Sequence, residues 1–241
     1  MLWIIIALFA LLFFLTKHFS QTLYNLIFTL TKSRTFPISI LALIFFPGIV
    51  VHELSHWIMA EMIRVRTGEI TLYPVIEANG SVRLGSVAIE RTDPFRRLTV
   101  GLAPIVLGIV LLASLTLVWK QYLVGTLGID ISSILTISPD LQALQKLFSS
   151  PFTYGYIYAS FVIGSTMYSS KKDVEGFAVV ASIAAFIAIV LYFGDLLPSG
   201  KGIEDKLQAQ LTLVLLPLSI AVGMNIVFLG LFKGLLRIMR K

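Results

Sequence analysis

The stretch FPGIVVHELSHWIMAEMIRV, Phe46 to Val65, decides the fold class. It is apolar enough for a transmembrane helix, yet it carries His52, Glu53 and His56 in its middle. An ionisable side chain within a membrane segment costs at least about 2–3 kcal/mol, so such residues usually mark function. On a helix, the two histidines lie roughly 12–18 Å before Arg64, where the apolar stretch ends. We therefore expect a membrane helix with a chemical site inside it.

The whole chain has the composition of an integral membrane protein. Of its 241 residues, 57% are hydrophobic and 13% are charged, and the mean hydropathy is +0.90. Soluble domains are nearer to about 45–50% apolar and about 25% charged. The chain has no cysteine, which excludes disulfides and cysteine-ligated metals. Its net charge of +6 comes without a basic patch interleaved with aromatics, so we expect a lipid bilayer around it and no nucleic-acid partner.

Six apolar segments predict how the chain is organised. They cover residues 2–16, with a continuation toward 31, then 37–63, 98–119, 153–170, 174–194 and 208–232. Most approach the roughly 20 residues that a helix needs to cross a bilayer. We expect an all-α polytopic membrane protein, one domain over 1–241 with about six transmembrane helices. The first segment lacks a basic residue before it and a clear cleavage site, so it is expected to be a retained helix.

The Lys and Arg residues predict the orientation. With the amino terminus inside and six crossings, twelve of the 19 basic residues fall inside and seven fall outside. Membrane proteins keep an excess of Lys and Arg in cytoplasmic loops. The bias is modest, because the basic residues of 17–34 oppose it. We expect a multi-pass protein of a prokaryotic plasma membrane, with the HELSH site toward the cytoplasmic side.

Two loops separate the predicted helices. Residues 69–73 and 81–89 have strand-type composition, and Asn79-Gly80 is a turn signal between them. We therefore expect a small β-hairpin loop over 68–90, directly after the HELSH helix. The loop at 120–151 is partly amphipathic and too short for an independent domain. It is expected to be extracytoplasmic.

The five residues His52-Glu53-Leu54-Ser55-His56 form an HExxH motif. On a helix, positions i and i+4 lie about 40° apart and one turn up, so both imidazoles can reach one ion. Catalytic Zn²⁺ commonly has three protein ligands and a water. Glu53, beside the first histidine, can take a proton from the attacking water and deliver it to the leaving amine. The motif predicts a zinc hydrolase, with His52 and His56 as ligands and Glu53 as general acid/base.

A third ligand has to come from elsewhere in the sequence. On the same helix, Glu61 points about 140° away from His56, so it faces wrongly and is expected to contact an interface or a loop. The remaining candidates for this ligand are Asp93, Asp173, Glu175 and Asp195. Asp93 precedes Pro94 and resembles a helix N-cap. The predicted topology places 173 and 175 on the same side as Arg64, which favours Asp173 and Glu175.

The order of these features resembles the site-2 proteases, which are intramembrane zinc metalloproteases. HELSH lies within a membrane helix, a hairpin-like loop follows, and GLAPIVLG at 101–108 is similar to the family's Gly-Pro motif. The family's later pattern, Asn-x-x-Pro-x-x-x-Leu-Asp-Gly, corresponds to the segment 165–174, within STMYSSKKDVEG. The resemblance implies that Asp173 is the third zinc ligand. It also implies that the substrate is a transmembrane segment of another protein.

The chain departs from the family pattern at four positions. Ser165 replaces the Asn, Tyr168 the Pro, Lys172 the Leu and Val174 the Gly. In that pattern the Asn and Pro are thought to hold the substrate strand, so substrate handling is expected to differ. We expect neither a PDZ insert nor a nucleotide-binding extension, so the chain resembles a minimal core of the family.

Two other functions remain open at this point. The buried ionisable residues of HELSH could relay ions or protons in a transporter, although the sequence has no paired inverted repeat of broken segments. The chain could also be an inactive scaffold that binds partner helices, but a scaffold has no need of Glu53. As a separate alternative, the HExxH match could be fortuitous, with the histidines as hydrogen-bond partners between helices. No feature of the sequence indicates an oligomeric state.

Overall fold

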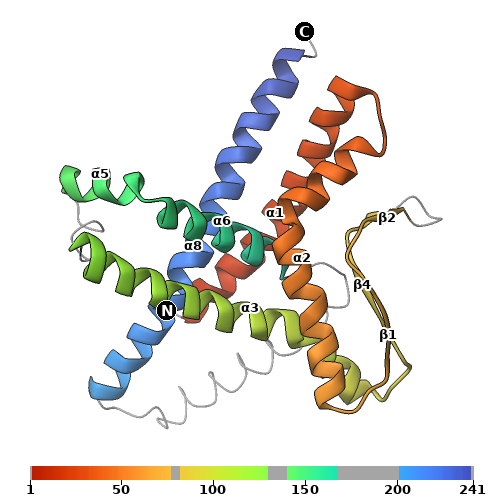
Figure 1. Ribbon diagram of the computed structural model, residues 1–241, viewed down its shortest axis with the longest axis horizontal. Coiled ribbons are helices and arrows are strands. Elements are labelled where there is room, and N and C mark those ends of the chain that lie inside the picture. The colour runs from red at the N-terminus through yellow and green to blue at the C-terminus, as the bar shows by residue number, and fades with distance from the viewer. Residues whose placement is uncertain (1, 77–81, 130–139, 168–200, 240–241) are drawn as a thin grey trace.

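A computed structural model describes residues 2–76, 82–129, 140–167 and 201–239 (Figure 1). Its helices are α1 (Leu2–Thr31), α2 (Phe36–Met62), α3 (Pro94–Tyr122), the π-helical turn η1 (Leu123–Leu127), α5 (Leu141–Ser149), α6 (Pro151–Thr166) and α8 (Lys201–Met239). Within these described ranges, four stretches are long and apolar enough to cross a membrane, namely Ile4–Thr31, Phe36–Met62, Pro94–Leu127 and Gln210–Met239. The predicted all-α membrane fold is confirmed.

The predicted segments differ from the helices mainly at their ends. The first segment continues as one helix to Thr31, and α8 extends from Lys201 to Met239. Helix α6, which corresponds to the predicted segment 153–170, has only 16 described helical residues. The predicted segment 174–194 lies outside the described residues. The loop predicted at 120–151 contains the last turn of α3, η1 and the short helix α5.

Helix α2 ends in a turn that leads the chain into the β-hairpin. The N–H of Val65 donates to the carbonyl of Ala60 at 2.8 Å, and the N–H of Arg64 donates to that of Glu61 at 3.1 Å. This pair of bonds is a Schellman motif, with Arg64 in the left-handed conformation at φ 59°. Because the chain reverses here, the strands that follow run back along α2.

The predicted hairpin is present but interrupted. Strand β1 (Thr67–Thr71) pairs antiparallel with β4 (Ser86–Ile89), and β2 (Val75–Ile76) pairs antiparallel with β3 (Val82–Arg83). A register shift lies between Thr67 and Ile70. The predicted Asn79-Gly80 turn lies outside the described residues. Both β1 and β4 contact α2, and Figure 1 shows this ribbon beside the second half of that helix.

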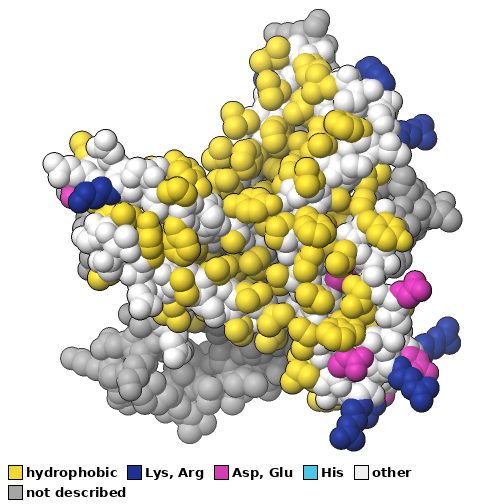
Figure 2. All heavy atoms as spheres, in the orientation of Figure 1, with side chains coloured by type: hydrophobic (Ala, Val, Ile, Leu, Met, Phe, Trp, Pro, Cys, Tyr) yellow, Lys and Arg dark blue, Asp and Glu magenta, His cyan; other side chains and the backbone are white. Residues whose placement is uncertain are grey.

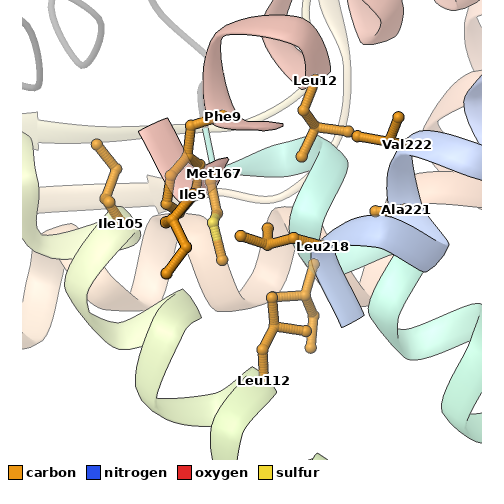
Figure 3. Packing of buried hydrophobic residues seen from close by; sticks show 10 residues of the cluster. Ile5, Phe9, Leu12, Ile105, Leu112, Met167, Leu218, Ala221 and Val222 are labelled. Carbon is orange, nitrogen blue, oxygen red and sulfur yellow. The ribbon is translucent and has the colours of Figure 1, made fainter. Parts of the chain in front are cut away.

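Helix α6 packs at the centre of the bundle, against α1, α2, α3 and α8. One buried cluster joins four of these helices, and Figure 3 shows Met167 beside Ile5 and Phe9; the cluster comprises Ile5, Phe9, Leu12, Ile105, Leu112, Ile163, Met167, Leu218, Ala221 and Val222. A second cluster is aromatic, with the ring of Phe19 at 5.6–6.2 Å from those of Phe45, Phe161, Phe228 and Phe232. The second cluster packs α6 against α2 at Phe45 and Ile49, just before the HELSH residues.

A row of polar contacts joins α3 to α6 at the end farther along α3. Thr116 and Tyr156 share a hydrogen bond of 2.9 Å between their hydroxyls, and the rings of Trp119 and Tyr156 stack at 4.4 Å. The indole N–H of Trp119 donates to Thr153 Oγ1 at 3.4 Å. Hydrogen bonds between membrane helices contribute about 0.6 kcal/mol each on average, so this row chiefly sets the helix register.

The outer surface of the bundle is largely apolar. Figure 2 shows hydrophobic side chains over the middle of the visible face, with most of the charged side chains toward its edges. Leu43, Phe14 and Ile226 are 71%, 59% and 51% exposed. Apolar patches of this extent are rare on soluble monomers and normal where lipid is the solvent. The exposed surface, like the composition, is therefore that of a membrane protein.

Candidate functional site

The HELSH residues lie in the second half of α2, one turn after Pro47. His52 and Glu53 are each only 4% exposed, and His56 is half-buried. Gly48, on the same helix, lets α6 approach closely, because a Cβ at that position would overlap Thr166 Oγ1 and lie 2.8 Å from the Val162 side chain. The site is thus enclosed between α2 and the end of α6.

The two imidazoles face one another across one helical turn. Their Nε2 atoms are 3.2 Å apart, and the rings are nearly perpendicular, at 86°. Two histidine nitrogens bound tetrahedrally to one zinc, each at about 2.0–2.1 Å, would lie about 3.3–3.4 Å apart. The described histidine pair therefore fits two of the ligand positions around a single zinc ion.

A backbone carbonyl of α3 orients the second histidine. His56 Nδ1 lies 2.8 Å from the carbonyl oxygen of Val100. A carbonyl only accepts hydrogen bonds, so Nδ1 carries the proton and Nε2 carries the lone pair. Metal-ligating histidines almost always donate their other ring N–H to a carbonyl or a carboxylate in this way. The arrangement presents the basic nitrogen of His56 toward His52.

The hairpin covers the carboxylate of Glu53. Gly85, between β3 and β4, is buried, and a Cβ there would lie 2.8 Å from Glu53 Oε1 and 2.8 Å from Ile49 Cγ2. The backbone of residue 85 can approach the carboxylate this closely only because glycine has no side chain. The start of β4 therefore lies directly over the predicted general acid/base.

A narrow cleft, too small to admit a water molecule, lies beside the first histidine. It is lined by Val51, His52, Pro104, Ile163, Thr166 and Met167, which come from α2, α3 and the end of α6. Next to it, Asn225 of α8 donates from Nδ2 to Ser165 Oγ at 2.9 Å, and its side chain is fully buried. Position 165 has Ser where the family pattern has Asn, but a carboxamide still reaches that position from α8. The sequence alone gave no sign of this contact.

Two of the carboxylates considered as the third ligand, Glu61 and Asp93, are described, and neither lies with the two histidines. Glu61 Oε1 accepts a hydrogen bond of 2.7 Å from Thr67 Oγ1, so it contacts the start of the hairpin as predicted. Asp93 is the N-cap of α3 and accepts from the N–H of Arg96 at 3.0 Å. This hydrogen bond holds the pKa of the Asp93 carboxyl below its ordinary value.

The other candidate ligands, Asp173, Glu175 and Asp195, lie outside the described residues. Within the described ranges, no group of three His, Asp or Glu side chains is placed to hold a metal ion. The described chain before them ends at Met167, which lines the cleft beside His52. Asp173 follows six residues later in the sequence.

Comparisons with protein-family models, with curated proteins and with solved structures each found no significant match. The chemistry of the site is therefore argued from its own residues. Those residues are two imidazoles that fit one ion, an adjacent buried carboxylate, and a hairpin that covers that carboxylate.

Proposed function

We propose that this chain is a zinc-dependent intramembrane endopeptidase, similar to the site-2 proteases, that cleaves transmembrane segments of other proteins. The observation that carries the proposal is the 3.2 Å separation of the His52 and His56 Nε2 atoms on an apolar, membrane-length helix. Ionisable side chains within a membrane segment are energetically costly, so such residues usually mark a function. The adjacent Glu53 completes the HExxH set, which is the donor and base arrangement of zinc peptidases.

His52 and His56 would hold the zinc together with one carboxylate. Asp173 is the first candidate for that carboxylate because of the family pattern, and Glu175 is the second. When bound, zinc supplies a Lewis acid that polarises a carbonyl and lowers the pKa of a water toward about 7. The lone pair that the Val100 carbonyl directs onto His56 Nε2 suits the histidine to this role.

Glu53 would act as general base and then as general acid. Its carboxylate takes a proton from water as the water oxygen bonds to the peptide carbonyl carbon. It then gives that proton to the amide nitrogen as the C–N bond breaks, which yields an amine and a carboxylic acid that releases its own proton to become a carboxylate. Proton transfer by a positioned side chain is worth about 10²–10⁴-fold in rate. Burial at 4% exposure keeps competing bulk water away from this group.

The hairpin would present the substrate to this carboxylate. A transmembrane helix satisfies its own amides, so a scissile bond is hidden until the segment unwinds. An unwound segment can add to a sheet as a further strand, with main-chain hydrogen bonds giving affinity. Strand β4 begins directly after Gly85, which lies beside Glu53, so a strand added there would lie next to the carboxylate. The predicted orientation places this event near the cytoplasmic side of the membrane.

The direct test is a search for new amino termini in membrane proteins. Membranes from cells that produce the wild-type chain would be compared with membranes that contain Glu53→Gln, which keeps the side chain's shape but removes its base. We expect new termini within transmembrane segments in the wild type only, with cleavage reduced by about 10²-fold or more. A set of cleavages identical in both samples would contradict the proposal.

A further inference from the structure

The carbonyl that orients His56 belongs to a residue whose usual helical partner is missing. In an α-helix, the carbonyl of residue 100 accepts from the N–H of residue 104. Residue 104 is proline, which has no N–H and removes that bond. Val100 is 3% exposed and Pro104 is buried, so this carbonyl lies away from solvent. A buried carbonyl without a partner is costly, and it therefore requires a donor from elsewhere.

His56 supplies that donor from the neighbouring helix. Its Nδ1 lies 2.8 Å from the Val100 oxygen, which is the distance of a good N–H···O bond. The bond fixes the proton on Nδ1 and turns the lone pair of Nε2 toward His52 Nε2. Pro104 itself lines the cleft beside His52, so proline and carbonyl both face the site.

We infer that Pro104 is a positioning residue for His56. By withholding an N–H from the Val100 carbonyl, it leaves that oxygen to hold His56 in the tautomer that a metal requires. A proline in this helix also kinks it, and the clash of its ring with the preceding turn is enough to produce a kink. The positioning role requires the missing N–H, and the two roles can be separated. The consequence for zinc rests on the proposed function, whereas the tautomer does not.

The test compares two replacements at position 104. Pro104→Ala restores the N–H, which then competes with His56 for the Val100 oxygen. Lactic acid inserted at 104 by nonsense suppression removes the ring but, as an ester, still has no N–H. Pro217→Ala removes the proline inside α8 and is the matched control. The chain has only three histidines, so ¹⁵N-histidine NMR resolves each ring, with His18→Ala for assignment.

The tautomer is read on zinc-free protein at alkaline pH, where the imidazoles are neutral. We expect the proton of His56 on Nδ1 in the wild type, in the lactic acid protein and in Pro217→Ala, and a loss of that population in Pro104→Ala. Zinc affinity, measured by competition with a chelator, is expected to fall about 10–100-fold in Pro104→Ala alone. An unchanged His56 tautomer in Pro104→Ala would overturn the inference. So would a loss in the lactic acid protein that equals that in Pro104→Ala.

The two proposals fail separately in this experiment. A wild type that binds no zinc, but in which the His56 tautomer depends on residue 104 as described, would refute the metalloprotease and uphold the positioning role. If all four proteins bind zinc with equal affinity and the His56 tautomer is the same in each, the positioning role is refuted and zinc binding is upheld.

Discussion

At the scale of single residues, the site depends on close approaches that only small or unusual residues permit. Glycine at 85 brings the start of β4 onto the Glu53 carboxylate, and glycine at 48 brings α6 against α2. Proline at 104 leaves a carbonyl for His56. Each of these residues acts through the absence of an atom, a Cβ or an amide hydrogen. Substitutions that add that atom are therefore the most informative tests.

Gly85→Ala is expected to impair cleavage without affecting the metal ligands. The added Cβ would lie 2.8 Å from Glu53 Oε1, so either the carboxylate or the hairpin has to move. A displacement of about 1 Å at a catalytic group costs on the order of 10²-fold in rate. We expect the cleavage rate to fall about 10–100-fold while zinc content is unchanged. Gly155→Ala is the matched control, because a Cβ there meets nothing within 4 Å.

The sequence predicted the histidine pair and its glutamate, because HExxH depends only on helical spacing along one element. It did not predict the partners of these residues. Val100 is 44 positions from His56, and Gly85 is 32 positions from Glu53. Such contacts depend on how α3 and the hairpin dock on α2, and no local pattern encodes docking. Pro104 was the one sequence feature that could have indicated that the Val100 carbonyl, four residues earlier, lacks its helical donor.

At the scale of elements, the second half of α2, the end of α6 and the strands β1 and β4 lie around the HELSH residues. The hairpin contacts α2 through β1 and β4, and the register pairs Ile70 with Val87 and Thr71 with Ser86. If an unwound substrate adds to this sheet as a strand, its binding depends on a regular backbone at β1 and β4. A proline in either strand removes a donor and distorts the strand.

Val87→Pro or Thr71→Pro is accordingly expected to abolish cleavage. Neither residue contributes a group to the histidine pair, so bound zinc should stay at the wild-type level. Val87→Thr is the control for the first variant, because it keeps both the backbone N–H and a β-branched side chain. Cleavage and zinc content would be measured on the same preparations. Normal cleavage in the proline variants would show that the substrate does not bind by strand addition.

The boundaries of elements were harder to predict than their types. Hydropathy indicated where a bilayer lies, but a helix continues past polar residues because its backbone bonds are internal. Helix α1 therefore includes Lys17 and His18 and ends only at Thr31, where Lys32 adopts φ 56°. The short helix α5, within the loop 120–151, was not predicted as a helix. Its nine residues are amphipathic and too short to give a transmembrane signal.

At the scale of the whole molecule, an apolar exterior surrounds a polar site in its interior. The described charges lie mostly near the ends of helices, and the arginines at 64, 66, 96 and 97 follow α2 or begin α3. This distribution fits a bundle embedded in lipid with one strongly basic end. The described residues contain four long helices that could cross the membrane, and the sequence predicts six segments.

The orientation can be tested with single cysteines, because the natural chain has none. Arg91→Cys, in the loop before α3, is expected to react with an impermeant thiol reagent only from the cytoplasmic side. Lys146→Cys, in α5, is expected to react only from the outside, since α3 separates the two positions by one crossing. Labelling would be compared in intact cells and in inverted membrane vesicles. Reaction of both cysteines from the same side would contradict the predicted topology.

The third ligand can be assigned with the same protein preparations that test the metal. Asp173→Ala is expected to weaken zinc binding strongly, and Glu175→Ala is expected to leave it unchanged. Both residues follow the end of α6, which lines the cleft beside His52. Zinc that survives Asp173→Ala and is lost in Glu175→Ala would transfer the ligand role to Glu175.

The most direct test of the central claim is the zinc content of detergent-purified protein prepared without a chelator. The account predicts about one zinc per chain in the wild type, which is the content of a single two-histidine catalytic site. His56→Ala should lose it. His18→Ala is the matched control and should retain it, because His18 is exposed on α1 and bonds to its own helix at Phe14. A wild type without zinc, or zinc that persists in His56→Ala, would contradict the account and favour an ion relay or a scaffold.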